Sequence, residues 1–199
     1  MATGRSNYLT KQTGEYIVAA ELSRRGFIAT TFTGNVPSYD IVAVDGQGGH
    51  ALVQVKAIAA ASWQLNVGQF ADVAFNGPKQ IIQGQLDDPY PDLVCVMVQI
   101  APPDSGRADR FFVLPWHELG KIVIAGHSRF LAKHGGVRPR NPASLHTAVH
   151  PDVLAHWEGR WQVLTRRVRP TPANTALQPT TRARRARVKT RKRARAARG

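Results

Sequence analysis

The chain has little of several features that would define a protein class. Its one cysteine, Cys95, lies in the apolar run "DLVCVMVQI", so no disulfide can form within the chain and we expect a small buried hydrophobe. No run approaches the roughly 18 apolar residues of a membrane span. The opening "MATGRSNYLTKQTGEY" lacks the apolar core of a signal peptide. We therefore expect a soluble protein of the reducing cytoplasm.

Acidic residues are also scarce, and one end of the chain has none. The chain holds 27 Lys or Arg against 13 Asp or Glu, a formal net charge of +14. Residues 1–165 are nearly balanced, with 14 basic and 13 acidic residues, whereas residues 166–199 hold 13 basic residues and no acid. Such a segment buries too little apolar surface to offset chain entropy. We predict one domain, residues 1–165, followed by a disordered Arg/Lys-rich tail, residues 166–199.

The domain alternates helical and extended patterns. A helix is predicted for 13–26, with Thr13 as N-cap and Gly26 at the C-terminal cap. Strands are predicted near 27–33, 39–45, 50–57, 62–67, 92–101 and 110–115, with helices near 116–125 and 151–161. Residues 68–91 carry no clear pattern. This order favours an α/β or α+β domain with a mixed central sheet.

Polar side chains interrupt the predicted hairpin "SYDIVAVDGQGGHALVQVKA". Gln54 and Lys56 share one face of their strand, about 7 Å apart. A three-residue loop places Asp40 opposite Gln54 or Lys56, whereas a four-residue loop places them on opposite faces. The glycines of "GQGG" favour the shorter loop. A carboxylate, an amide oxygen and an ammonium would then share one patch, which suits a hard cation beside a phosphate.

The first predicted helix contributes another carboxylate. Glu15 lies on the same helical face as Val18, Ala19 and Leu22, which should pack on the sheet. A carboxylate at that position needs a partner. Taken singly, Glu15 fits a first-turn partner of the helix dipole, and Asp40 fits a strand-edge residue.

Together these residues resemble the PD-(D/E)XK nuclease superfamily, and most closely the archaeal Holliday-junction resolvases. Glu15 precedes "GF" at 26–27 by eleven residues, "SYD" enters one strand, and "QVK" ends the next. The resemblance covers residues 12–57 and implies a restriction-endonuclease-like αβββαβ core. Here Ser and Tyr precede Asp40 in place of Pro, and Gln54 replaces the usual carboxylate. Some active members, including a transposon end-cleaving endonuclease, also carry Gln there.

The resemblance implies metal-dependent hydrolysis of DNA phosphodiester bonds. Asp40, Gln54, Lys56 and Glu15 would be the catalytic residues. Mg²⁺ or Mn²⁺ would be held by Asp40, Gln54, Glu15 and the backbone carbonyl of Val55. Lys56 would act on the attacking water or the developing charge. With the charge lost at Gln54, we expect weaker metal binding than in an all-carboxylate member.

Partners follow from the same resemblance and from the charge. The polar loop before Asp40 is a candidate substrate contact through Thr33, Gly34, Asn35 and Ser38. The tail is a candidate electrostatic arm for DNA, or for RNA, in a nucleoid-associated protein. Its candidate contacts are Arg182, Arg184, Arg185, Arg187, Lys189, Arg191, Lys192 and Arg193. No membrane partner is expected, and a homodimer is one option because resolvases of this type are dimers.

Three hypotheses remain open from the sequence. The first is an active DNA endonuclease. The second is a catalytically silent nuclease-like domain that binds nucleic acid, which the presence of Gln54 favours. The third is an interaction protein whose domain only carries the basic arm.

Overall fold

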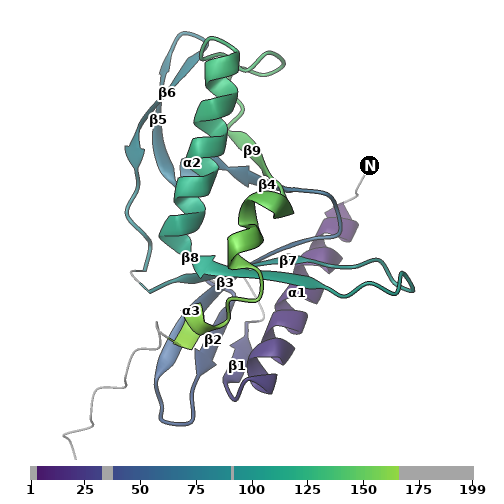
Figure 1. Ribbon diagram of the computed structural model, residues 1–199. Helices are drawn as coiled ribbons and strands as arrows, with labels where there is room; N and C mark the ends of the chain where they lie inside the picture. Colours follow the sequence, from purple (N-terminus) through teal and green to yellow (C-terminus); the bar gives the residue numbers. More distant parts are fainter. Residues whose placement is uncertain (1–3, 33–37, 91, 166–199) are drawn as a thin grey trace, which may run out of the picture.

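A five-stranded mixed sheet forms the centre of the molecule (Figure 1). The computed structural model describes residues 4–32, 38–90 and 92–165. The sheet has the order β1-β2-β3-β7-β8, in which only the β3–β7 pair is parallel. Its strands are β1 (Ile28–Thr31), β2 (Ile41–Val44), β3 (His50–Ile58), β7 (Val94–Gln99) and β8 (Arg110–Pro115). The predicted α+β class with a mixed sheet is confirmed.

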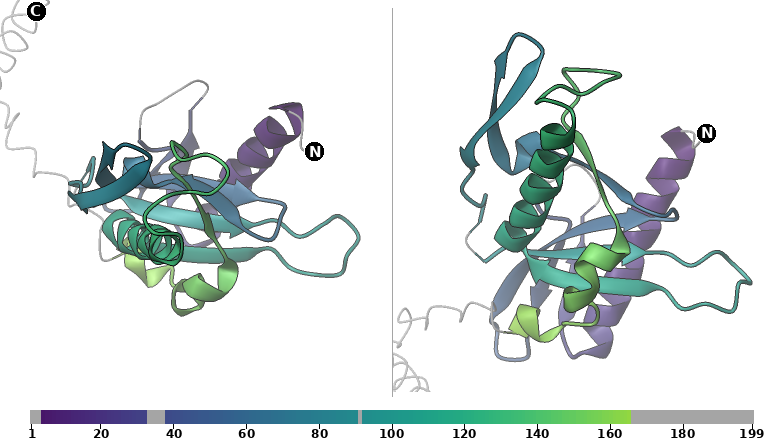
Figure 2. Two further views of the ribbon diagram at one scale, coloured as in Figure 1. Left: turned by 90° about the horizontal axis from the view of Figure 1, so that it is seen from above. Right: turned by 45° about the horizontal axis from the view of Figure 1, so that its top comes forward.

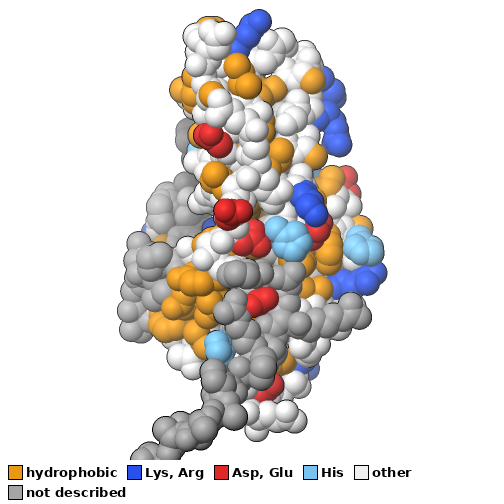
Figure 3. All heavy atoms as spheres, turned by 90° about the vertical axis from the view of Figure 1, so that its left-hand side faces the viewer, with side chains coloured by type: hydrophobic (Ala, Val, Ile, Leu, Met, Phe, Trp, Pro, Cys, Tyr) orange, Lys and Arg blue, Asp and Glu red, His pale blue; other side chains and the backbone are white. Residues whose placement is uncertain are grey.

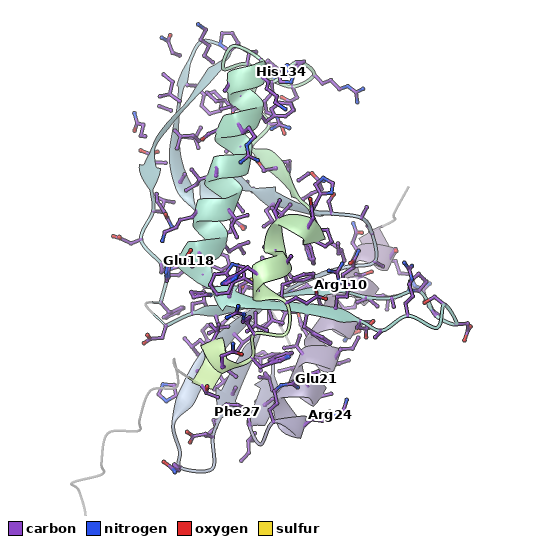
Figure 4. The ribbon with its side chains drawn as sticks, viewed as in Figure 1. Glu21, Arg24, Phe27, Arg110, Glu118 and His134 are labelled. Carbon is purple, nitrogen blue, oxygen red and sulfur yellow. The ribbon has the colours of Figure 1, made fainter. Side chains whose placement is uncertain are left out.

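Helix α1 (Gly4–Arg24) covers one face of the sheet (Figure 2). Val18 and Leu22 of α1 are fully buried against Val53 and Val55 of β3. The helix ends as predicted, because Gly26 adopts a φ of 87° and Phe27 donates its N–H to the Leu22 carbonyl at 3.1 Å, as in a glycine C-terminal cap. Close to this end Arg24 pairs with Glu21 at 2.9 Å (Figure 4).

The start of α1 differs from the prediction. The helix begins at Gly4, so Thr13 is no N-cap and Glu15 lies in the helix interior, outside the first turn. The extra turns are polar and mostly exposed, and therefore show no apolar period. Hydroxyl groups there bond back to the helix, as the Thr10 side chain does to the Ser6 carbonyl at 3.0 Å.

The opposite face of the sheet is covered by helix α2 (Trp116–Lys133) and by added strands. Here β4 (Trp63–Asn66) pairs with β9 (His146–Val149), and β5 (Ala71–Asn76) pairs with β6 (Lys79–Gln85). Trp63, Phe112 and Leu119 are in the core between these layers. The chain then passes through two 3-10 helices, η1 (Val67–Gln69) and η2 (Pro151–Trp157), and ends its described part in α3 (Gln162–Thr165).

The element order departs from the expected αβββαβ sequence. Between β3 and β7 the described residues contain β4, η1, β5 and β6 and no α-helix, and α2 follows β8 instead. Residues 68–91, which carried no clear pattern, form most of this connection. A helix predicted near 151–161 is a 3-10 turn starting at Pro151 and the short α3. No helix in the described ranges has the length and apolar character needed to cross a bilayer.

Candidate functional site

The β2–β3 hairpin has the three-residue loop that sets the site's geometry. The Asp45 N–H donates to the Gly49 carbonyl at 2.8 Å, and Gly48 takes a φ of 85° inside the loop. The Asp45 side chain accepts from the N–H groups of Gln47 and Gly49 at 2.9 and 2.7 Å. This turn pairs Ile41 with Val53, so the next residues outward, Asp40 and Gln54, stand opposite each other. The predicted shared face is confirmed.

The Asp40 carboxylate extends the hydrogen bonding between β2 and β3 beyond the first residue of β2. Asp40 precedes the strand, and its Oδ2 accepts the Val55 N–H at 2.8 Å and the Nε2 of Gln54. A side chain therefore satisfies a backbone donor that β2 does not reach. The Asp40 side chain is 10% exposed, so its charge lies in a weakly screened position.

Gln54 supplies an amide nitrogen between two oxygens. Its side chain is buried, and Nε2 donates to Asp40 Oδ2 and, at 3.2 Å, to the Val55 carbonyl. Those two oxygens are among the predicted metal ligands. In this arrangement the Gln54 oxygen, the atom predicted to bind metal, is turned away from them because the nitrogen faces both acceptors.

Helix α1 reaches the site through a close helix–strand contact. A Cβ built on Gly14 would lie 2.3 Å from the Ala57 Cβ, so only glycine permits this approach. The next residue, Glu15, is thereby brought towards Asp40, and its side chain is 14% exposed. Burial, and then the Asp40 charge, raise the pKa of Glu15, while Lys11 lowers it.

Lys11 joins the two carboxylates. Its Nζ lies 3.5 Å from Glu15 Oε1 and 3.8 Å from Asp40 Oδ1. The first is an i, i+4 pair along α1 and the second connects the helix to the residue before β2. Lys11 was not among the predicted site residues, although its spacing four residues before Glu15 indicates an ion pair along a helix.

Lys56 lies two residues beyond Gln54 on the same face of β3. It is half-buried, and within the described residues no carboxylate oxygen is at ion-pair distance from its ammonium. Its backbone carbonyl accepts the Trp63 indole N–H at 2.8 Å, which ties the end of β3 to β4. Burial raises the pKa of nearby Cys95 to about 12, with smaller opposing effects of Lys56 and Asp40. Cys95 is the small buried residue that was expected.

Ser38 is the predicted loop contact that lies within the described residues. It has a φ of 73°, in the left-handed region that few non-glycine residues adopt. Three other predicted loop contacts, Thr33, Gly34 and Asn35, lie outside the described residues, as do the eight basic tail residues between Arg182 and Arg193. His127 lies in α2 and is fully buried.

The donor set has the chemistry of a hard-cation site but few charges. Within the described ranges no three His, Cys, Asp or Glu side chains form a group that could hold a metal ion. Two carboxylates are present, Glu15 and Asp40, with the Gln54 amide and Val55 carbonyl beside Asp40. All four groups offer oxygen, which Mg²⁺ and Mn²⁺ prefer. Asp40 and the Val55 carbonyl already converge on the Gln54 amide nitrogen, a partially positive group. The same oxygens would suit a cation if the Gln54 amide turned its own oxygen towards them.

Fold and site together define an α+β protein with a polar cluster where the first helix meets the central strands. The sequence matches no model of a protein family, and no match was found among the curated proteins or the solved structures.

Proposed function

We propose that the chain is a metal-dependent endonuclease that hydrolyses phosphodiester bonds in DNA. The observation that carries the proposal is the meeting of Asp40, Gln54 and the Val55 carbonyl within hydrogen-bond distance, with Glu15 linked to Asp40 through Lys11. The residues come from separate elements, and most of the side chains buried in the domain are apolar. A hydrophobic core alone gives no reason for such a cluster, because burying carboxylates lowers stability unless they are paired.

The finer fold assignment belongs to the same proposal. A helix packed on an antiparallel three-strand unit, with a further strand parallel to β3, supports a restriction-endonuclease-like core. The helix-free connection between β3 and β7 is a departure from that core. It leaves the α1–β2–β3 unit, where the site residues lie, intact.

Each side chain has a role in the proposed reaction. Asp40, Glu15, the Gln54 amide oxygen and the Val55 carbonyl would hold Mg²⁺ or Mn²⁺, for which the Gln54 amide must turn its oxygen inward. The bound cation supplies Lewis-acid polarisation of the phosphate and orients water. Lys56 has no described carboxylate at ion-pair distance, so its charge is available to a phosphate oxygen or to the charge that develops during attack.

The second candidate, a silent domain that binds nucleic acid, is favoured by one specific observation. The Gln54 Nε2 already satisfies Asp40 and the Val55 carbonyl without a cation. On this alternative the cluster is a structural network, and DNA affinity comes from positive charge elsewhere. On the face shown in Figure 3, described Lys and Arg side chains are scattered and lie among acidic ones. The excess of basic residues is in 166–199.

Cleavage of labelled DNA tests the two candidates against each other. The full chain is incubated with four-way-junction, duplex and single-stranded DNA, in Mg²⁺, Mn²⁺ or EDTA. We expect metal-dependent cutting that falls by about 10²-fold or more in Asp40→Asn and in Lys56→Met. The matched controls, Asp72→Asn and Lys133→Met, change the same charges at exposed positions on β5 and α2 and should cut normally. An inert wild type that still binds DNA would favour the silent domain.

A further inference from the structure

Lys11 occupies the position of a counter-ion in the candidate site. Its ammonium lies within 4 Å of carboxylates on two different elements, α1 and the residue before β2. A lysine on a helix surface ordinarily pairs along its own helix, and such exposed pairs are weak. Here both carboxylates are mostly buried, with 14% and 10% of their side-chain area exposed. Their charges are therefore poorly screened by solvent.

The two carboxylates share one ammonium. The Lys11 Nζ lies 3.5 Å from Glu15 Oε1 and 3.8 Å from Asp40 Oδ1, and both carboxylates are mostly buried. The Gln54 amide partly satisfies Asp40 Oδ2, but it carries no net charge. Lys11 is the described cation that lies between Glu15 and Asp40 Oδ1.

We infer that Lys11 is the protein's own counter-ion for Asp40 and Glu15 and competes with the divalent cation for them. This inference rests on the proposed function, and it makes Lys11 a residue that sets the metal affinity of the site. Its side chain is 55% exposed, so the ammonium can swing into solvent when a metal binds, without movement of the backbone. Retaining Lys11 beside a bound divalent cation would place three positive charges against two carboxylates, which favours its displacement.

The inference predicts that removing the Lys11 charge tightens metal binding. In the full chain, Lys11→Met and Lys11→Gln should bind Mn²⁺ roughly five- to tenfold more tightly than wild type, as measured from the free Mn²⁺ signal in electron paramagnetic resonance. Lys11→Arg keeps the charge and should retain the wild-type affinity. Lys121→Met is the matched control, because Lys121 is 59% exposed and pairs with Glu118 on α2. Binding that is lost in Asp40→Asn identifies the site.

A second readout does not depend on titrating the metal. Without metal, Lys11→Met should melt at a lower temperature than Lys121→Met, because it leaves two buried carboxylates without a cation. Saturating Mn²⁺ should shrink that difference. If Lys11→Met and Lys121→Met melt at the same temperature both with and without Mn²⁺, the inference is contradicted. This comparison can be made even if one of the variants is too unstable for titration.

The outcomes separate this inference from the proposed function. If the wild type binds Mn²⁺ through Asp40 but the uncharged Lys11 variants bind no more tightly, Lys11 is no competitor and the metal site stands. If neither the wild type nor any Lys11 variant binds Mn²⁺ in an Asp40-dependent way, the metal site itself is refuted, and the competition with it.

Discussion

Gln54 is the residue that distinguishes the two proposed functions. An amide can donate from nitrogen or accept at oxygen, and here it donates to Asp40 and to the Val55 carbonyl. In the absence of metal the amide nitrogen can thus bridge two oxygens by hydrogen bonds. With a metal present, the amide oxygen can bind the cation. A glutamate at this position could do only the second, since an ionised carboxylate has no hydrogen to donate.

Asp40 also has a structural role that a substitution would reveal. Its Oδ2 accepts the Val55 N–H at 2.8 Å in a part-buried position. Asp40→Ala should leave that donor and the Gln54 amide without their acceptor and lower the free energy of unfolding by about 1–3 kcal/mol, measured by urea denaturation. Asp40→Asn, which keeps one acceptor oxygen, should lose less. Equal losses in the two variants would mean that the acceptor is unimportant for stability.

At the scale of elements, the contact between α1 and β3 positions Glu15. Alanine is normally preferred over glycine in a helix by about 1 kcal/mol. At Gly14, however, the added methyl would lie 2.3 Å from the Ala57 Cβ and 3.6 Å from its Cα. We expect Gly14→Ala to destabilise the protein by about 1–3 kcal/mol in urea denaturation.

Two further variants check the cause of that loss. Ala57→Gly, combined with Gly14→Ala, removes the Ala57 methyl group with which the new side chain clashes. The double variant should therefore recover much of the lost stability. Gly126→Ala is the helical control, because its added Cβ would meet the Thr147 Cγ2 at an ordinary 3.6 Å. If Gly14→Ala is as well tolerated as Gly126→Ala, the close approach of α1 does not limit stability.

A buried histidine joins three elements on the other side of the sheet. His127 of α2 is fully buried, with Nε2 2.8 Å from Gln80 Oε1 on β6 and Nδ1 2.6 Å from Thr147 Oγ1 on β9. Since the Gln80 oxygen only accepts, Nε2 carries the hydrogen and Nδ1 accepts from the hydroxyl. A charged imidazolium would place a hydrogen on both nitrogens, in a site that burial makes unfavourable for charge.

That arrangement predicts a loss of stability in acid. Burial chiefly, and the Arg138 charge next, lower the pKa of His127 from its ordinary 6.5. The unfolded chain therefore binds the proton more readily, and the free energy of unfolding should fall as pH drops below about 6.5, by at most about 1.4 kcal/mol per pH unit. His127→Gln should flatten this dependence between pH 7 and 5, whereas His134→Gln, at an exposed position, should not. Parallel pH curves for wild type and His127→Gln would contradict the assignment.

The elements that could be predicted from sequence are those whose pattern is local. The β-branched strands and the Gly26 cap follow from period and turn chemistry, and the glycines of the hairpin loop indicated the register that places Asp40 beside Gln54. The start of α1 could not be predicted, because its exposed turns have no apolar face. The β5–β6 pair was missed for a similar reason: Phe75 and Ile81 are half-exposed, so no clean alternation marks those strands.

The site itself could be predicted only in part. Asp40, Gln54 and Glu15 were found by their order and spacing. The structure places Gln54 against Asp40 and links Glu15 to Asp40 through Lys11. The direction of the Gln54 amide depends on two acceptors, the Asp40 carboxylate across the hairpin and the Val55 carbonyl of its own strand, and is invisible in sequence. Lys11 was passed over because the helix was expected to start after it.

At the scale of the whole molecule, charge is divided between the domain and the end of the chain. Residues 1–165 are nearly neutral, and residues 166–199 hold 13 basic residues and no acid. Electrostatic binding to DNA should therefore come mainly from the tail, which lies outside the described residues.

The salt dependence of DNA binding tests this division. Replacing the eight basic residues between Arg182 and Arg193 by glutamine in the full chain should weaken duplex binding at low salt and reduce the slope of log K against log salt, by up to about seven. Fluorescence anisotropy at several salt concentrations measures both. An unchanged slope would show that the tail does not contact phosphates, and would move the DNA-binding surface to the domain.

The most direct test of the metal site is the Mg²⁺ dependence of single-turnover DNA cleavage by wild type and Gln54→Glu. If Gln54 is a metal ligand, both proteins cut, and Gln54→Glu reaches half its maximal rate at a lower Mg²⁺ concentration because it adds a carboxylate. Cleavage by neither protein at any Mg²⁺ concentration, or identical Mg²⁺ curves for the two, would contradict the account.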